Sequence, residues 1–352
     1  MTLIPVYAEG LGAGILELGY TGALAAGGYT VMTILSGLLL DRYEKIRLYL
    51  AFNLFTTGAL TFLFFTRSLD GVLFARALIG FTGGAFWTSA GTVTADLAPK
   101  DHLAFAIGRY NLSWIIGFVI GPFFGGFISD VFGYNTLWLF LIGITMVANA
   151  LIGFLLVPGI RLKSSANEIR FDFPAVKQLK YAYLAMIPYA LGLGLYFAII
   201  PGYLAESGVS ASVIGVLIAA SGAIKGVGFF YSERIVALGP WKGLLTGAIL
   251  LSMSLLWIGY SATGWAYLFP LLLYGASNGI IEPIILDYLA RNSPKDSLGT
   301  TMGVYEGIYG ASTCISPLAA GLIGTYSSPV TIYIILSMVS LFIIPVARKL
   351  RI

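Results

Sequence analysis

The sequence predicts an all-α membrane protein built from two similar helical bundles, and three observations lead to this fold class. Apolar residues (A, V, I, L, M, F, W, Y and C) make up 58% of the chain and charged residues 10%, whereas an average soluble protein is about 45–50% apolar with glycine included. Apolar runs long enough to cross a bilayer recur along the chain. In addition, the second half repeats the residue pattern of the first.

The internal repeat keeps one constant offset over long stretches without a gap. Such a duplication of membrane helices predicts two bundles that face each other across a central site, an arrangement typical of transporters. The pairs that fall into register are Gly80 with Gly275, Gly84 with Gly279, Pro99 with Pro294, Tyr110 with Tyr305, Pro122 with Pro317 and Gly126 with Gly321.

The individual helices are predicted from the apolar runs, because a helix needs about 20 apolar residues to cross about 30 Å of hydrocarbon. Eleven runs meet this length. They cover residues 16–40, 48–66, 71–97, 104–129, 135–157, 181–204, 211–231, 243–262, 265–290, 301–326 and 330–347.

An odd number of helices in a duplicated chain points to one absent helix. Residues 4–9 match residues 200–206, so the helix predicted at 181–204 corresponds to residues that would precede Met1. We therefore expect helices 2 to 12 of a twelve-helix plan, with the first helix represented only by its exit at residues 3–7. Either the start of the sequence has been placed too late, or the chain begins on the outer side of the membrane.

Charge distribution predicts the orientation and the domain organisation. Nearly all lysines and arginines lie in alternate loops. The positive-inside rule places these loops, and the C-terminus with them, on the cytoplasmic side of a cell membrane. The net charge of +4 is thereby explained without nucleic acid. The longest such loop separates the two copies. We predict an N-terminal bundle at 1–160 with its first helix truncated, a cytoplasmic linker at 161–180 and a C-terminal bundle at 181–352.

Several chemistries are excluded by residue content. The chain has one cysteine and one histidine, Cys314 and His102, which cannot form an internal disulfide or a zinc site. Neither a phosphate-binding glycine loop nor a nucleophile paired with a base is found in the loops. We therefore predict a protein that is not an enzyme and uses no cofactor or metal.

Two local patterns combine charges with glycines. A full charge inside a membrane helix costs several kcal/mol unless it is paired or hydrated, so Arg76 is expected to face the protein interior or, alternatively, to extend to the outer interface. The first pattern is Gly37, Asp41, Arg42, Lys45 and Arg47, and the second is Arg76, Gly80, Gly83, Gly84 and Ala85.

A third pattern is rich in glycine and contains one proline. Glycines spaced by four residues clear one face of a helix for close approach of another, and Pro122 removes a backbone hydrogen bond and permits a bend. These residues therefore predict a packing hinge. The pattern is Gly117, Gly121, Pro122, Gly125 and Gly126.

Together the three patterns resemble those of a major facilitator superfamily (MFS) transporter, over helices 2 to 12 of that family's plan. The resemblance implies that Asp41 and Arg42 help to latch the two halves on the cytoplasmic side, unless they serve only as topology charges. It also implies that Arg76 acts in proton movement or on a substrate charge. The glycine pattern resembles the fifth-helix signature common in drug/proton antiporters, which favours efflux.

The second copy holds further charges within helices. Asn278 and Glu282 share one helical stripe, which is the repeat partner of a stripe ending at Trp87, and the family resemblance implies that both stripes line the central cavity. An unpaired carboxylate there would take up a proton readily, so Glu282 is a candidate for proton coupling. Lys225 lies at a similar depth and is expected either to pair with Glu282 or to extend to the lipid headgroups.

Matching polar and aromatic clusters lie near the same ends of equivalent helices. They suit a lipophilic or amphipathic cation in a cavity, but aromatic residues also form ordinary belts at membrane interfaces. Glu306 within a helix needs a hydrated cavity or a partner. The clusters are Tyr110, Asn111 and Trp114 in one copy and Tyr305, Glu306 and Tyr309 in the other.

These observations predict a monomeric secondary active transporter that works by alternating access between two bundles, with a small molecule and protons as its partners in the lipid bilayer. The leading version is proton-coupled efflux of a small organic compound. The alternative is proton-coupled uptake of a sugar or organic acid. A different class, a non-transporting membrane receptor or an inactive truncated fragment, remains as a further alternative.

Overall fold

The structure is a computed structural model that describes residues 2–40, 42–99, 102–160, 162, 172–261, 264–294 and 297–350. These residues are almost all helical, and no strand occurs among them, which confirms the predicted all-α fold. Ten helices in the described part are long and apolar enough to cross a membrane.

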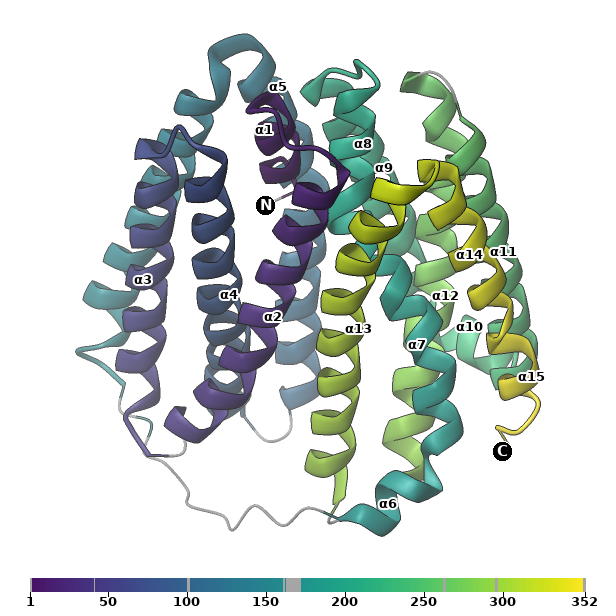
Figure 1. Ribbon diagram of the computed structural model, residues 1–352. Helices are drawn as coiled ribbons and strands as arrows, with labels where there is room; N and C mark the ends of the chain where they lie inside the picture. The colour runs from purple at the N-terminus through teal and green to yellow at the C-terminus, as the bar shows by residue number, and fades with distance from the viewer. Residues whose placement is uncertain are drawn as a thin grey trace.

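Figure 1 shows these helices in two groups that stand side by side. Polar side chains cap several starts; Ser68, for example, accepts a hydrogen bond from the N–H of Gly71. The first group contains α1 (Ile4–Gly10), α2 (Ile15–Leu40), α3 (Lys45–Phe65), α4 (Leu69–Leu97) and α5 (Leu103–Leu151), which continues as a π-helical turn (Ile152–Leu156). The second contains α6 (Phe173–Gln178), α7 (Lys180–Gly194), a π-helical turn (Leu195–Ile199), α8 (Ile200–Glu206), α9 (Ala211–Phe230), α10 (Ser232–Ala237), α11 (Pro240–Tyr260), a 3-10 turn (Gly264–Tyr267), α12 (Leu268–Asn292), α13 (Leu298–Tyr326), α14 (Pro329–Leu341) and α15 (Ile343–Ala347).

One element, α5, contains two of the predicted membrane helices, those at 104–129 and 135–157. The backbone leaves the helical conformation at Gly133, where φ is 82° and ψ is 163°. A residue with a side chain rarely adopts such a positive φ, so glycine permits the turn. The two halves of α5 then lie against each other, since a Cβ atom at Gly125 would lie 3.8 Å from Cδ1 of Leu137.

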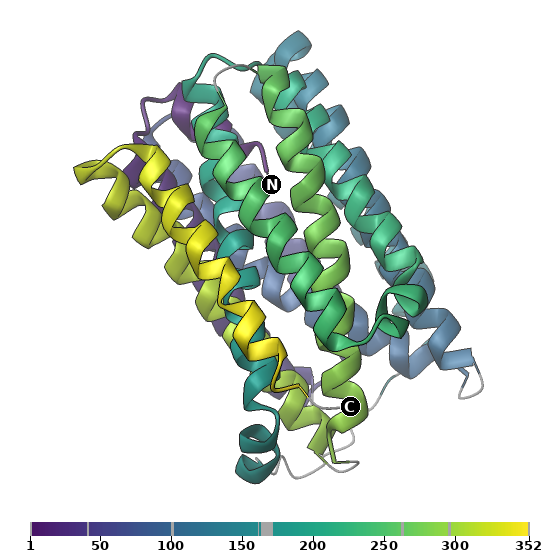
Figure 2. The same ribbon diagram turned by 90° about the vertical axis from the view of Figure 1, so that its right-hand side faces the viewer.

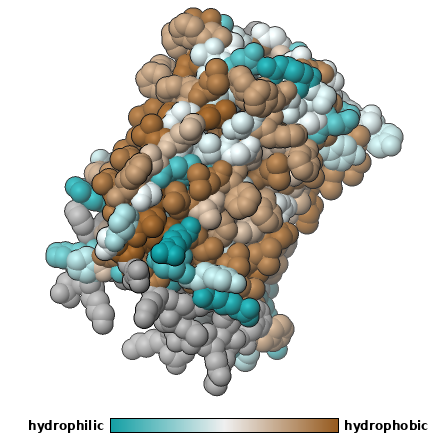
Figure 3. Space-filling model, turned by 90° about the vertical axis from the view of Figure 1, so that its left-hand side faces the viewer, coloured by the Kyte–Doolittle hydropathy of each residue, from teal (hydrophilic) through white to brown (hydrophobic). Residues whose placement is uncertain are grey.

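The molecule has two distinct ends, which Figures 1 and 2 show from perpendicular directions. One end carries α6 and the C-terminus and is called the linker end below. The opposite end carries α1 and α8 and is called the far end. The flank of the first bundle between the two ends is mainly hydrophobic, as expected of a surface that faces lipid (Figure 3).

Within each bundle two helices touch backbone to backbone at repeat-matched glycines. A Cβ atom added at Gly80 would lie 2.1 Å from the carbonyl oxygen of Ala25, and one added at Gly275 would lie 2.2 Å from that of Ser221. Both distances are shorter than any that real Cβ atoms keep, so only glycine fits. These contacts hold α4 against α2 and α12 against α9, as the repeat in sequence leads one to expect.

Two further crossings join the bundles to each other in the far half of the molecule. A Cβ atom added at Gly126 on α5 would lie 2.3 Å from the carbonyl oxygen of Ala211 on α9. At the repeat-matched crossing, a Cβ atom added at Gly321 on α13 would lie 3.0 Å from the carbonyl oxygen of Ile15 on α2. The two crossings are therefore related by the same repeat that relates the bundles.

The predicted glycine stripe is only partly used for packing. A Cβ atom added at Gly125 would lie 3.0 Å from Cδ1 of Leu3, so this glycine is closely packed. The expectation of close packing is wrong for Gly117 and Gly121, where an added Cβ would meet no atom within 4 Å. The physical reason is that α9 crosses α5 at Pro122 and Gly126, which lie one residue round the helix from the stripe of Gly117, Gly121 and Gly125. The hinge role of Pro122 stays a prediction.

The segments at either side of the inter-bundle linker are hydrogen-bonded to helix ends. Glu44 caps α3 and also accepts a hydrogen bond from the N–H of Leu162 at 3.2 Å. At the other side, the Ser297 hydroxyl donates to the Asp172 carboxylate, and the N–H of Ala175 donates to it as well. Both donors hold the pKa of Asp172 below its usual value. Each bundle thus binds one edge of the linker.

The first residue of α3 forms an ion pair that sequence reasoning did not predict. Nζ of Lys45 lies 2.6 Å from Oδ2 of Asp96 at the end of α4. Of the predicted latch residues, Arg42 is exposed and Asp41 lies outside the described residues. The buried Lys45 requires a counter-charge, and Asp96, whose side chain is 34% exposed, supplies it from the end of α4.

We expect Asp96→Asn to lower the free energy of unfolding by about 2 kcal/mol, because hydrogen bonds to charged groups contribute about 1.5–3 kcal/mol and Lys45 would be left buried. Asp287→Asn is the matched control, since its pair with Arg291 leaves the arginine side chain 73% exposed and should contribute only a few tenths of a kcal/mol. Thermal unfolding in detergent measures both. Equal shifts for the two variants would contradict the assignment.

Candidate functional site

A cavity of ≈ 520 Å³ lies between the two bundles. Helices α2, α4 and α5 form one side, and α7, α9, α12 and α13 form the other. Every residue predicted for the cavity or for coupling lines it except Tyr110. Those residues are Arg76, Trp87, Asn111, Trp114, Lys225, Asn278, Glu282, Tyr305 and Glu306.

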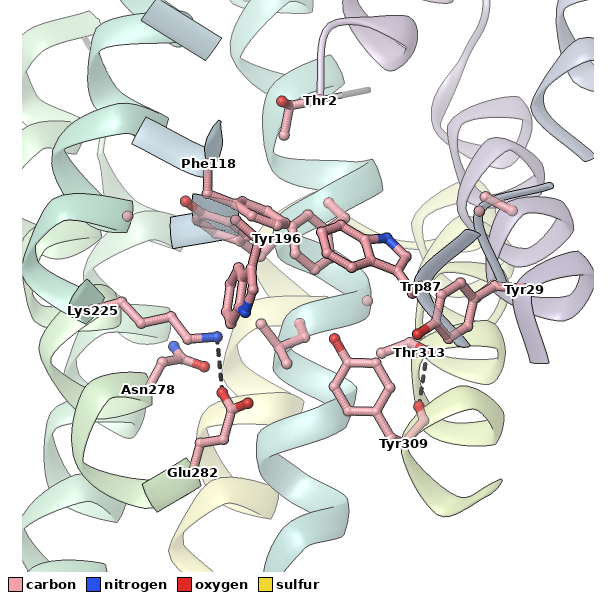
Figure 4. A pocket seen from close by; sticks show the side chains of 18 of the residues that line it. Thr2, Tyr29, Trp87, Phe118, Tyr196, Lys225, Asn278, Glu282, Tyr309 and Thr313 are labelled. Carbon is pink, nitrogen blue, oxygen red and sulfur yellow. Dashed lines mark hydrogen bonds and ion pairs between the residues drawn. The ribbon is translucent and has the colours of Figure 1, made fainter. Parts of the chain in front are cut away.

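An ion pair stands in the wall of this cavity. Nζ of Lys225 on α9 lies 2.8 Å from Oε2 of Glu282 on α12, and the two side chains are 22% and 14% exposed. Figure 4 shows them pointing toward each other, with Asn278 beside them. The sequence left two arrangements open for Lys225, a pair with Glu282 or extension to the lipid headgroups. The structure shows the pair. The glycine crossing at Gly275 explains it, because it brings the backbones of α9 and α12 into contact.

Tyr189 completes a three-residue cluster that sequence reasoning missed. Its hydroxyl donates a hydrogen bond to Oε2 of Glu282, the same oxygen that Lys225 contacts. Tyr189 is 1% exposed and lies on α7. No sequence signal distinguishes it among the 21 tyrosines of the chain.

Lys225 also has contacts across the gap between the bundles. Its ammonium lies 5.8 Å from the ring centroid of Trp114 on α5 and 5.6 Å from that of Phe229 on its own helix. Such cation–π contacts contribute about 0.5–2 kcal/mol each. The lysine is therefore held by one carboxylate in its own bundle and by one aromatic face of the other bundle.

Arg76 is buried in the first bundle, with 6% of its surface exposed. Its Nε donates to the carbonyl oxygen of Thr21 on α2 at 3.3 Å. The alternative in which Arg76 extends to the outer interface is wrong, because the close crossing of α2 and α4 supplies a backbone acceptor within reach. The guanidinium thus contributes positive charge to the cavity wall.

The aromatic residues form a continuous wall rather than an interfacial belt. The ring of Trp114 lies 6.4 Å from that of Trp87 and 5.5 Å from that of Phe118, edge to face. Tyr110 does not line the cavity; it lies behind Trp87, with ring centroids 6.2 Å apart. Oδ1 of Asn111 accepts a hydrogen bond from the indole N–H of Trp114 at 3.2 Å. Further lining residues that the sequence did not single out are Tyr29, Phe118, Tyr196, Phe197, Phe229 and Tyr274.

Glu306 differs from Glu282 in its surroundings. It is exposed on the cavity surface of α13, and no ion-pair partner for it occurs in the described part of the chain. Tyr305 and Tyr309 flank it on the same helix, with their rings stacked 6.4 Å apart. Tyr29 faces it from α2 within electrostatic reach. Tyr29 is the structural counterpart of Lys225, because the repeat-matched Gly84 and Gly279 approach the carbonyl oxygens of Tyr29 and Lys225. It lies one residue away from the position that the constant offset of the repeat gives.

Asn278 places a buried polar atom without a hydrogen-bond partner among the described residues in the cavity wall. It is 1% exposed, and its Nδ2 donates to the carbonyl oxygen of Tyr274 at 2.6 Å. Its Oδ1 has no hydrogen-bond partner among the described residues. A buried acceptor without a partner is costly, so a cavity water or a ligand donor would satisfy it. The cavity therefore combines a paired carboxylate, an accessible carboxylate, a free amide oxygen and aromatic faces.

Comparisons with known proteins agree on one family. The sequence profile of the Major Facilitator Superfamily matches residues 1–317. An uncharacterised MFS-type transporter of Methanocaldococcus jannaschii is 24% identical over 319 residues, which are 86% of this chain and 81% of that protein. The multi-drug resistance efflux pump PmrA of Streptococcus pneumoniae is 29% identical over 140 residues, only 39% of this chain and 35% of the pump. The human organic anion transporter MFSD10 has a similar fold, with a TM-score of 0.67 at 16% identity over 94% of this chain and 83% of that chain.

Proposed function

Because the chain belongs to the Major Facilitator Superfamily of membrane transporters, we propose that it is a secondary active transporter that carries a small organic compound through the central cavity. The observation that supports this best is the cavity itself, which lies between the two bundles and contains the charged residues that are rare in membrane helices. Alternating access would arise from movement of one bundle against the other around this site. Family members carry small-molecule substrates and act as monomers.

We propose proton-coupled efflux as the direction and energy source. The aromatic wall and the accessible carboxylate of Glu306 favour a lipophilic or amphipathic compound as the substrate. The partial similarity to a multi-drug efflux pump points the same way. By the positive-inside rule, the linker end would face the cytoplasm of the cell membrane.

Glu282 is the proposed site of proton coupling. With Glu282 charged, Lys225 and Glu282 form a neutral pair. A proton on Glu282 would leave Lys225 as an uncompensated cation, with the rings of Trp114 and Phe229 as its remaining contacts. Because an unpaired charge in a membrane interior is costly, the protonated protein would favour a conformation in which Lys225 reaches water or another partner. Protonation would thus shift the relative populations of the two conformations.

Proteoliposomes with an imposed pH gradient test this proposal. We expect a fluorescent lipophilic cation to move against the direction of proton flow, with proton movement followed by a trapped pH dye. A neutral sugar and an aromatic carboxylate serve as comparison substrates. If none of the three moves faster than in protein-free liposomes, whichever way the gradient is directed, the proposed transport function is wrong.

Proton-coupled uptake of an organic acid is the second candidate, and the presence of Lys225 and Arg76 in the cavity wall favours it. A proton on Glu282 would free Lys225 to bind a carboxylate, so that proton and anion would move together. In the same assay, this function predicts that the aromatic carboxylate moves with the protons and that the lipophilic cation does not move.

A further inference from the structure

A second pocket, of ≈ 470 Å³, lies at the linker end of the second bundle, away from the central cavity. It is formed where α6 meets α7, beside Tyr288 on α12 and the residues that follow α15. Two of its lining residues, Arg348 and Lys349, are positively charged and exposed. Its place at the ends of three membrane helices puts it at the depth of lipid headgroups rather than of hydrocarbon.

Positive charges gather around two aromatic rings at this pocket: that of Tyr181, which lines it, and that of Trp241, which lies beside the lining, as Lys180 does. The ammonium groups of Lys180 and Lys349 lie 5.1 and 5.2 Å from the centroid of the same ring, that of Tyr181. The guanidinium of Arg348 lies 5.0 Å from the ring centroid of Trp241. Among the described residues, no carboxylate forms an ion pair with any of these three cations. Like charges that share one ring repel each other, and a bound anion would offset that repulsion.

The basic pocket is not part of the duplicated architecture. At the constant offset of the repeat, Arg348 and Lys349 correspond to Gly153 and Phe154 in the first bundle. Phe154 is 83% exposed there, as expected of a residue that faces lipid tails. Arg348 and Lys349 are therefore specific to the second bundle, whereas the glycine crossings occur in both.

We propose that this pocket binds a phosphate-type anion, supplied by the headgroup of an anionic phospholipid. The lysines around Tyr181 and the arginine over Trp241 would hold the phosphate charge, and the side-chain amide of Gln178 in the lining can donate a hydrogen bond to it. Clusters of basic residues at the ends of membrane helices are suited to such headgroups. The site is independent of the proposed transport function, because it shares no residue with the central cavity.

Binding to purified protein tests the site, with native mass spectrometry as the readout and short-chain phosphatidylglycerol, phosphatidylcholine and inorganic phosphate as probes. We expect the double variant Lys180→Gln/Lys349→Gln to bind phosphatidylglycerol about 25-fold more weakly than the wild type. This corresponds to about 2 kcal/mol at about 1.4 kcal/mol per factor of ten, or about 1 kcal/mol per lysine near a membrane surface. The single variant Lys349→Gln should lose about fivefold and serves if the double variant folds poorly.

Arg234→Gln is the matched control, since that arginine also lies over a tyrosine ring, 5.4 Å from the centroid of Tyr231, but outside the pocket. It should bind the lipid as the wild type does. Tight binding of phosphatidylglycerol but not phosphatidylcholine identifies a lipid as the source, and binding of inorganic phosphate alone identifies a soluble source; both depend on the lysines. An equal loss in Arg234→Gln, or no loss in the lysine variants, would overturn the proposal.

Discussion

Replacing Glu282 with Gln should abolish the response of transport to a pH gradient while leaving the protein folded. The amide keeps the shape of the carboxylate and can still accept the hydrogen bond that Tyr189 donates. It cannot bind a proton in the relevant pH range, and it cannot neutralise Lys225. Substrate movement in proteoliposomes, compared with and without the gradient, measures the effect, and thermal unfolding shows whether the variant is folded.

A double-mutant cycle shows whether the ion pair itself carries the effect. Lys225→Met keeps an apolar stem against Trp114 and Phe229, while it removes the charge. Each single variant leaves one member of the pair without its partner, whereas the double variant removes both charges. We expect a coupling energy of about 2 kcal/mol in the free energy of unfolding, within the range of about 0.5–3 kcal/mol for residues in contact.

Glu306→Gln is the matched control for this cycle, because it is the same substitution in the same cavity at a carboxylate with no ion-pair partner among the described residues. It should leave stability unchanged and show no coupling to Lys225→Met. If Glu282→Gln still moved substrate in response to the gradient and Glu306→Gln did not, proton coupling would have to be assigned to Glu306 instead.

The features of the fold that could be predicted are those that depend on one helix or on the repeat. Apolar length identifies the membrane helices, and the constant offset places Gly80 and Gly275 at equivalent crossings. The pairing of Lys225 with Glu282 could be anticipated because both lie at similar distances from the same ends of their helices. Depth along a helix is a one-dimensional quantity, so the sequence can supply it.

The features that could not be predicted depend on which neighbour lies beside a given helix face. The stripe from Gly117 to Gly125 identifies a smooth face but not the helix that packs on it, and α9 in fact crosses at Gly126. Arg76 had two possible positions until the backbone of α2 was placed beside it. Tyr189 has neither a charge nor a spacing that would distinguish it. Such contacts require three-dimensional information.

The substitution Gly126→Ala is expected to disrupt the crossing that joins the bundles at the far end. The new Cβ would lie 2.3 Å from the carbonyl oxygen of Ala211 and 3.0 Å from its carbonyl carbon. These are backbone atoms, so α5 and α9 would have to move apart, and overpacking of this kind costs about 1–3 kcal/mol. If the bundles move against each other during transport, the variant should also populate the conformation that is open at the far end, with slowed transport.

Two matched variants are expected to show smaller losses of stability than Gly126→Ala. Gly321→Ala, at the repeat-matched crossing, would place its Cβ 3.0 Å from the carbonyl oxygen of Ile15 and should cost less than Gly126→Ala. Gly117→Ala, on the same helix as Gly126, would meet no atom within 4 Å. It should be neutral or stabilising by up to about 1 kcal/mol, because alanine is favoured over glycine inside a helix. Thermal unfolding gives the order of the three, and a cysteine introduced at the far end reports its opening through its rate of labelling. The same loss for Gly117→Ala as for Gly126→Ala would mean that the effect comes from the helix itself and not from the contact between the bundles.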